Sequence, residues 1–276
     1  MGTTSQAGRM GRMDQDAPAL FTQIDDGVVR PQGRSRGPWS PDALHGGPVA
    51  ALLAGEAQQA LGPSTPVSRL TIDLERPVPL ADLRISSKIV RPGRKVQVAE
   101  VEIHAADGTR LARATALGVR RAEAPLPDGV LGPVGGVDLG IGDAEPPIMY
   151  RPDDLDYYHL DAMDWGGERW DGDVITTWMR LSVPVLAGRE VSPLERVAAA
   201  ADFMNGISSR LPFGEWVFIN PDLTIAVHRA AVGEWIGVRA VTRLDPLGVG
   251  TAEADLFDEQ GRVGHALQNL LVEPAS

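Results

Sequence analysis

The sequence predicts an α+β protein that contains two copies of one helix-and-sheet unit. Two observations support this prediction. Residues 70–76 (LTIDLER) and 223–229 (LTIAVHR) are near copies of each other, 153 positions apart. Each copy is also preceded by a segment rich in alanine, valine and leucine that opens with Ser-Pro, at Ser40 and at Ser192. A helix that lies across a curled antiparallel sheet buries its apolar stripe, and two such units can pair into one continuous sheet.

The two Ser-Pro segments are each expected to form a helix of about four or five turns. Ser192 and Glu195 form a capping box, and Pro193 suits the first helical turn, where no N–H is needed. Ser40 has the same N-cap chemistry, although Ala43 stands where the glutamate would be. The Ser-Pro pairs are 152 positions apart, so one inserted residue is expected between helix and sheet.

Strands with a period of two residues follow each predicted helix. Leu223, Ile225 and Val227 fall on one face of a strand, as expected for a sheet with one buried face. The alternation changes phase between Val98 and Val101, which indicates a β-bulge. Turn residues between the later strands indicate antiparallel hairpins.

The repeat divides the chain into a first unit over residues 18–121, a linker over 122–154 and a second unit over 155–276. The linker is rich in Gly, Pro and Asp and has no hydrophobic periodicity, as expected of a connecting segment. Through the strands of the two units, the offset of 153 positions is predicted to continue without a gap, so that Leu117 matches Leu270.

The composition excludes several classes of function. The net charge of -11 argues against a nucleic-acid partner, because phosphate binding needs a basic face. Cysteine is absent from the sequence, so disulfides and cysteine nucleophiles are excluded. The histidines lack the spacing of metal ligands, and no metal is predicted. Residues 1–18 contain no apolar run typical of a secretion signal, and no run is long enough to span a membrane. We therefore expect a cytoplasmic protein.

Two longer motifs resemble a known family. His45-Gly46-Gly47-Pro48, followed by VAALLAGEAQQAL, resembles the loop-to-helix signature of the hotdog fold. The second half, from DLTIAVHR to LLVEP, resembles the C-terminal half of double-hotdog acyl-CoA thioesterases of the TesB type. The resemblance implies a double hotdog, each long helix being wrapped by an antiparallel sheet. It also implies an acyl-CoA hydrolase of lipid metabolism that acts through water, needs no cofactor and forms homo-oligomers.

In that family an aspartate, a Thr or Ser and a glutamine hold the hydrolytic water. The resemblance assigns these roles to Asp202, Asn220 and Gln268, with Asn220 in place of the hydroxyl residue. Asp222 is a nearby rival for the third role. The residues themselves support the assignment, because Asp202 follows four alanines and Gln268 alternates with apolar residues. Buried polar groups of this kind need partners and concentrate at functional sites.

The first copy lacks these polar groups. With the offsets above, Ala50 matches Asp202, Val67 matches Asn220 and Thr115 matches Gln268. Groups that occur in only one of two copies are not needed for the fold. The sequence therefore predicts one working site for each pair of repeats.

Two further groups of residues are candidates for substrate binding. His45 could act as a general base or could cap its helix, and the backbone N–H groups of Gly46 and Gly47 could bind a thioester oxygen. Arg91, Arg94 and Lys95 form a basic cluster that could contact the phosphates of coenzyme A or could simply be a solvated hairpin turn.

Two alternatives to a thioesterase remain open at this point. A hotdog enoyl-CoA hydratase or dehydratase would use an Asp and His pair, for which Asp42 and His45 are candidates. A non-catalytic acyl-CoA-binding module is favoured if Asn220 marks a site that has lost its activity.

Overall fold

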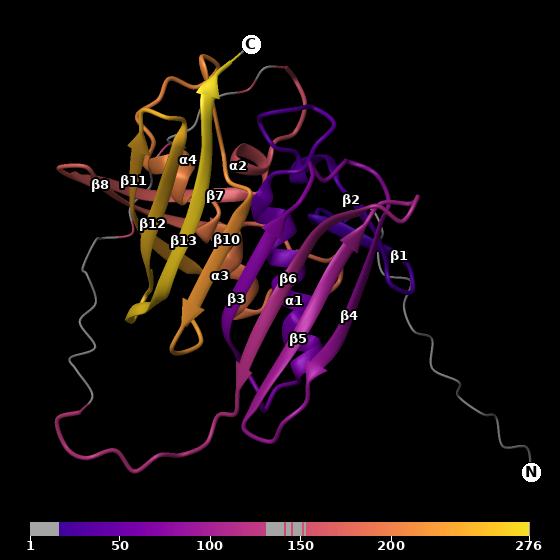
Figure 1. Ribbon diagram of the computed structural model, residues 1–276, viewed down its shortest axis with the longest axis vertical. Coiled ribbons are helices and arrows are strands. Elements are labelled where there is room, and N and C mark those ends of the chain that lie inside the picture. The colour runs from indigo at the N-terminus through magenta and orange to yellow at the C-terminus, as the bar shows by residue number, and fades with distance from the viewer. Residues whose placement is uncertain (1–16, 131–140, 142–144, 146–150, 152, 276) are drawn as a thin grey trace, which may run out of the picture.

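The computed structural model describes residues 17–130, 141, 145, 151 and 153–275. The expectations for residues 1–16 and for most of the linker therefore lie outside the described residues. In the described part, thirteen antiparallel strands form one sheet that curls around the helices (Figure 1). None of the helices in these segments is long and apolar enough to cross a lipid bilayer.

The first half of the chain contributes six strands, one α-helix and one short 3-10 helix. In chain order these elements are β1 (Phe21–Asp25), β2 (Val28–Pro31), η1 (Gly33–Ser35), α1 (Gly46–Leu61), β3 (Val67–Leu74), β4 (Leu83–Arg91), β5 (Val96–His104) and β6 (Arg110–Val119).

The second half contributes seven strands and three helices. They are α2 (Tyr158–Asp161), β7 (Met163–Asp171), β8 (Val174–Leu181), α3 (Pro193–Ala201), α4 (Met204–Ser208), β9 (Trp216–Ile219), β10 (Asp222–Val227), β11 (Trp235–Asp245), β12 (Val249–Asp258) and β13 (Gly261–Pro274).

The strand order is symmetric about the middle of the sheet. It runs β1-β2-β4-β5-β6-β3-β10-β13-β12-β11-β8-β7, with β9 paired to β13 off this path. The two central strands, β3 and β10, are the repeated segments that the sequence identifies, and Thr71 pairs with Thr224. Figure 1 shows them side by side between the two halves. The repeat is therefore also the junction that makes one sheet from two.

The repeat offset changes by one within the sheet. Ala99 on β5 and Ala252 on β12 are 153 positions apart and occupy matching places, but Ala99 pairs with Ala116 whereas Ala252 pairs with Gln268. The second hairpin turn is thus one residue shorter, and the prediction of a gap-free repeat is wrong. Because a slip of one residue turns a side chain to the other face, Gln268 matches the buried Ala116 and not Thr115.

Alternation along the strands is confirmed where it was predicted. Leu223 and Ile225 are buried, and Val227 is half-buried on the same face. The predicted irregularity lies next to Val98, but the extra residue is on the neighbouring strand β4, where the register shifts between Ile89 and Arg91.

The helices differ more from expectation. α1 is a long helix, but it begins at Gly46 with His45 as its N-cap, and not at Ser40. The chain before it is held extended, because the Leu44 N–H donates to the Val78 carbonyl at 2.8 Å. The predicted capping box at Ser192 is present at the start of α3.

The second long helix is broken after nine residues. α3 ends at Ala201, and the chain resumes as the short helix α4. The hydroxyl of Tyr158 donates to the Ala199 carbonyl, which would otherwise accept the N–H of Phe203. That N–H donates instead to Ala200, so the turn tightens at Asp202. The described residues therefore contain one long helix, α1, and not the two that the resemblance implies.

The two main helices lie against each other inside the sheet. α1 and α3 run antiparallel in contact, since Gly46 lies next to Asp202 and Gly55 next to Glu195. α1 packs on the strands of the first half, and α3 and α4 pack on β8, β11 and β12. One continuous hydrophobic core includes residues of both halves. Counted from the observed helix starts, Asp202 matches Gly55 and not Ala50.

A buried ion pair lies just after the C-terminal end of β10. The side chain of Asp258 is fully buried and accepts two hydrogen bonds from Arg229, one of them at 2.7 Å. Burial alone would raise the pKa of Asp258, but Arg229 and the N–H groups of Val232 and Gln260 together bring it below its usual value. The arginine thus has a structural role in this position.

We predict that Arg229→Met lowers the free energy of unfolding by about 3 kcal/mol at neutral pH, because it leaves a buried carboxylate unpaired. Urea denaturation measures this loss. The folded-state pKa of Asp258 is depressed, so the pair stabilises the fold above the unfolded pKa of about 3.9, and its contribution disappears as the pH falls through the folded value. The difference between wild type and variant should therefore shrink below about pH 4.

The matched control is Arg113→Met, which removes an exposed pair with Asp73. This change should cost less than about 1 kcal/mol. Equal losses for the two variants would contradict the structural role assigned to Arg229.

Candidate active site

The carboxylate of Asp202 lies at the start of α1. Asp202 follows the last residue of α3 and is only 6% exposed. A Cβ atom on Gly46 would stand 2.7 Å from both carboxylate oxygens, so only glycine allows this approach. Free N–H groups at a helix N-terminus favour a negative charge, which makes this a suitable place for the anion.

Two side-chain amides meet one oxygen of this carboxylate. Asn220 Nδ2 donates to Asp202 Oδ1 at 3.0 Å, and Gln268 Nε2 donates to the same atom at 3.2 Å. Asn220 lies in the two-residue gap between β9 and β10, whereas Gln268 lies on β13 and is fully buried. The structure thus brings together three residues that are separated by up to 66 positions.

The amide oxygens remain as acceptors in this arrangement. Among the described residues, Gln268 Oε1 is buried and has no hydrogen-bond partner. A buried acceptor without a donor costs about 1–3 kcal/mol. A water molecule or a substrate group that donates to this oxygen removes that cost, so the geometry fits a ligand with an O–H group next to Asp202.

One ring nitrogen of His45 faces both the start of α1 and the Asp202 carboxylate. His45 Nδ1 lies 3.0 Å from the Gly47 nitrogen and 3.0 Å from Asp202 Oδ2. A nitrogen that accepts the Gly47 N–H carries no proton and cannot donate to the carboxylate. Conversely, a protonated Nδ1 donates to Asp202 and leaves the Gly47 N–H free. His45 therefore caps α1 and also faces the carboxylate.

Aromatic side chains that no motif in the sequence indicates form the wall behind this site. The rings of Tyr158 and Phe203 stack with their centroids 5.3 Å apart, and His45 lies 4.7 Å from the Phe203 ring. Burial, followed by the charge of Asp202, raises the pKa of Tyr158 well above its usual value. Its hydroxyl therefore keeps the proton that it donates to Ala199.

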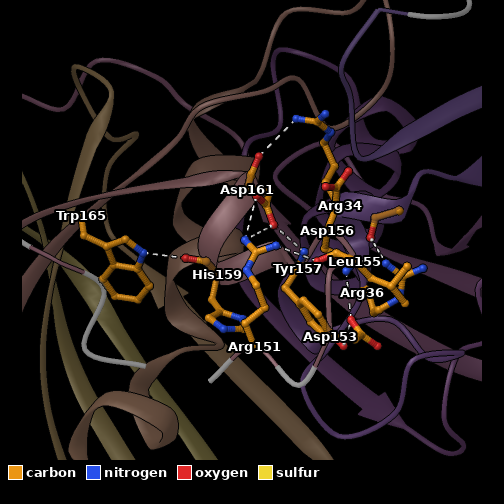
Figure 2. A network of polar contacts seen from close by, with 11 residues as sticks. Arg34, Arg36, Arg151, Asp153, Leu155, Asp156, Tyr157, His159, Asp161 and Trp165 are labelled. Carbon is orange, nitrogen blue, oxygen red and sulfur yellow. Dashed lines mark hydrogen bonds and ion pairs between the residues drawn. The ribbon is translucent and has the colours of Figure 1, made fainter. Parts of the chain in front are cut away.

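A network of polar contacts surrounds α2 (Figure 2). Tyr158 is the first residue of this helix. Arg36 donates to the Asp156 carbonyl at 2.7 Å, and Arg34 donates to the Asp161 carbonyl at 3.2 Å. The N–H of Tyr158 in turn donates to the Arg36 carbonyl at 3.0 Å. The residues around η1 in the first half thus position an aromatic side chain in the site of the second half. No spacing in the sequence predicts this contact.

The basic cluster is not part of this arrangement. Arg91, Arg94 and Lys95 are exposed on the hairpin between β4 and β5. Gly118, which pairs with β5 close to this hairpin, lies against Leu61 at the C-terminal end of α1. Asp202 is at the other end of that helix, about 24 Å away. The predicted contact of these cations with a substrate at Asp202 is therefore not supported.

The structure separates the two rivals for the third role. Both carboxylate oxygens of Asp222 accept hydrogen bonds from Asn269, which is exposed. Asn220, and not Asp222, contacts Asp202. Asp42 is likewise exposed, and His45 pairs with Asp202 instead. In the described segments, no three His, Asp or Glu side chains gather as metal ligands would.

Comparison with known proteins agrees with this architecture. Residues 35–119 match the family model of the acyl-CoA thioesterase N-terminal domain, and residues 135–272 match that of the C-terminal domain. No curated protein sequence matches the chain.

Solved structures share the fold at low sequence identity. A candidate thioesterase from Novosphingobium aromaticivorans superposes with a TM-score of 0.65 at 19% identity, over 92% of this chain and 99% of the other. The acyl-CoA thioesterase II TesB2 from Mycobacterium marinum gives 0.63 at 15% identity, over 93% and 96%. A protein of unknown function with a hotdog fold from Alicyclobacillus acidocaldarius gives 0.66 at 14% identity, over 92% and 96%.

The protein is thus a hotdog-fold protein with a carboxylate–amide site. More specifically, the chain belongs to the acyl-CoA thioesterase family, because the matched models cover most of its length. It hydrolyses acyl-CoA thioesters, and neither the hydratase nor the non-catalytic alternative is favoured.

We predict that Gly46→Ala lowers kcat by up to about 100-fold, because the new Cβ must displace the Asp202 carboxylate and a misplacement of about 1 Å in an active site can have this effect. Release of free thiol from an acyl-CoA measures the rate. Gly33→Ala is the control, since its Cβ would meet nothing closer than 3.7 Å. A Gly46 variant as fast as this control would show that the carboxylate does not need its observed position.

Proposed function

We propose that Asp202, Asn220 and Gln268 hold and activate the water that hydrolyses the thioester. One observation carries the proposal. Both amides donate to the same oxygen of a buried carboxylate, and the Gln268 oxygen beside it accepts nothing from the described residues. A water between the Gln268 amide oxygen and the Asp202 carboxylate would donate one O–H to each of them. Its lone pair would then point to the thioester carbon.

In the proposed reaction, Asp202 takes a proton from the water as its oxygen attacks the carbonyl carbon. The carbonyl π electrons move to the oxygen and form a tetrahedral oxyanion. When the carbon–sulfur bond breaks, the thiolate leaves with the bonding pair and takes the proton from Asp202, which gives free acid and coenzyme A. Every atom and electron comes from water and substrate, and no cofactor or covalent enzyme intermediate is needed.

The start of α1 is the proposed oxyanion site. Gly46 lies beside the Asp202 carboxylate, and the N–H of the next residue, Gly47, donates to His45 Nδ1. One such backbone donor is worth about 3–4 kcal/mol of transition-state stabilisation in other enzymes. When Nδ1 of His45 donates to Asp202, the Gly47 N–H is released for the substrate oxygen. His45 thus links the charge on Asp202 to the availability of this donor.

Asn220 can replace the Thr or Ser of related enzymes in this scheme. Its Nδ2 donates to Asp202, as a hydroxyl would, and also to the Asp222 carbonyl at 3.2 Å. Its amide oxygen remains available to accept a bond from the water.

We also propose the division into units 18–121 and 155–276 with a linker over 122–154, for which the symmetric strand order is support. Association into a homo-oligomer is proposed from an apolar row across the outer face of β9, β13 and β12. Ile219, Leu271 and Val249 are paired in this row and are 38%, 47% and 59% exposed. A cytoplasmic location and the absence of a nucleic-acid partner stay predictions from the sequence.

Asp202→Asn should lower kcat about 10²- to 10⁴-fold, the usual contribution of a general base. The amide is of equal size, and its oxygen can still accept from Asn220 and Gln268, so the free energy of unfolding should change by less than about 1 kcal/mol. Thiol release and urea denaturation measure the two effects. Asp222→Asn is the matched control and should stay close to wild type. Unchanged turnover in Asp202→Asn would remove this residue from the mechanism.

At Asn220 the donor should matter more than the residue type. Asn220→Thr keeps a donor to Asp202 and should retain kcat within about tenfold. Asn220→Ala removes a hydrogen bond to a charged group, worth about 1.5–3 kcal/mol, and should lower kcat by roughly 10- to 100-fold. Thiol release at saturating substrate distinguishes the two. Equal rates for these variants would show that Asn220 has no positioning role.

A further inference from the structure

A cavity of about 480 Å³ lies at the end of the helix pair opposite Asp202. Its lining comes from both halves of the chain and includes Gln58 near the end of α1, Val67 at the start of β3 and Leu194 at the start of α3. Its volume falls within the range of about 300–1,000 Å³ that is typical of ligand sites.

The cavity adjoins the place that the repeat assigns to a second active site. The start of α3 lines it, as the start of α1 lines the site of Asp202. Val67 in its wall is the match of Asn220, 153 positions earlier. The symmetric strand order relates the two ends of the helix pair. At Asp202 the end of α3 meets the start of α1, and at the cavity the end of α1 meets the start of α3.

The catalytic groups have no counterpart in this place. The matches of Asp202, Asn220 and Gln268 are Gly55, Val67 and Ala116. Among the residues that the structure describes, none that lines the cavity is acidic. The space for a ligand is retained, but the means to activate water is not.

The chemistry of the lining indicates an anionic ligand with an apolar part. Val67, Leu194 and Val197 give apolar walls. Arg120 and Arg121 stand exposed at the rim. Arg229, which also lines the cavity, is already neutralised by Asp258.

The basic hairpin adjoins this rim. The N–H of Arg120 donates to the carbonyl of Lys95 at 2.8 Å, so Arg91, Arg94 and Lys95 continue the row of cations. Five cations on neighbouring segments of an acidic chain match a ligand with several phosphate charges better than a single carboxylate.

We infer that this cavity is a second acyl-CoA site that binds without hydrolysis. The acyl chain would occupy the apolar cavity, and the phosphates of coenzyme A would contact Arg120, Arg121 and the hairpin. The inference uses the family's substrate class but does not depend on the mechanism proposed for Asp202.

The test is the number of ligands bound by each full-length chain, measured by calorimetry with a non-hydrolysable thioether analogue of an acyl-CoA. Wild type should bind two. Arg120→Glu with Arg121→Glu should bind one, or should bind the second at least tenfold more weakly, while its thiol-release kcat stays within about twofold. Both side chains are exposed, so the fold should tolerate the change. The matched control is Arg84→Glu with Arg169→Glu, which reverses two exposed charges on other strands. This variant should still bind two ligands.

The outcomes separate the possible ligands. One site in the wild type would overturn the inference, and so would loss of both sites in the Arg120 and Arg121 variant. Free coenzyme A should compete for the second site, whereas a free fatty acid that fills it equally well in wild type and variant would overturn the assignment of the phosphates. A turnover that survives Asp202→Asn would refute the proposed mechanism alone, because the binding count uses an analogue that is not hydrolysed.

Discussion

The close approach of the Asp202 carboxylate to the first turn of α1 is the contact on which the site depends. It requires a glycine at position 46, where a Cβ would overlap both oxygens. It also requires α3 to stop at this residue, which the Tyr158 hydroxyl brings about by occupying the Ala199 carbonyl. Each half of the chain thus provides something that the other half needs, since one supplies the helix start and the other supplies the acid.

This interdependence explains why the site is assembled from so many elements. Asn220 is held in the gap between β9 and β10, and Asn205 on α4 fixes that region by donating to the Phe218 carbonyl at 2.9 Å. Gln268 belongs to the longest strand of the sheet and donates to the Asp202 backbone as well as to its side chain. Elements on three sides therefore hold the carboxylate in place, as the electrostatic preorganisation in the proposed mechanism requires.

The sequence predicts those parts of the fold that depend on local pattern. The capping box at Ser192 and the alternation around Ile225 are local, and both are confirmed. The start of α1 could not be predicted, because Leu44 is held extended by a contact with Val78, 34 positions further along. The match of Gln268 with Ala116 follows from the pairing of strands, which the comparison of the two repeats in the sequence does not reveal. Similarly, the position of the basic hairpin relative to Asp202 depends on which end of α1 it meets, and no local signal carries that information.

The structure also contains a reason why the first copy has no second acid. At the position that matches Asp202, a Cβ on Gly55 would stand within overlap distance of the Glu195 carboxylate. Glu195 is almost fully buried, pairs with Arg189 at 2.6 Å and accepts from the Ser192 N–H in the capping box. A carboxylate at position 55 would therefore meet an existing buried one, and like charges in such a place strongly disfavour each other. The ion pair that caps α3 and the acid that would complete a second site compete for one space. The way in which the start of α3 is stabilised is therefore incompatible with an acid at position 55, and the cavity beside this ion pair keeps its shape without that acid.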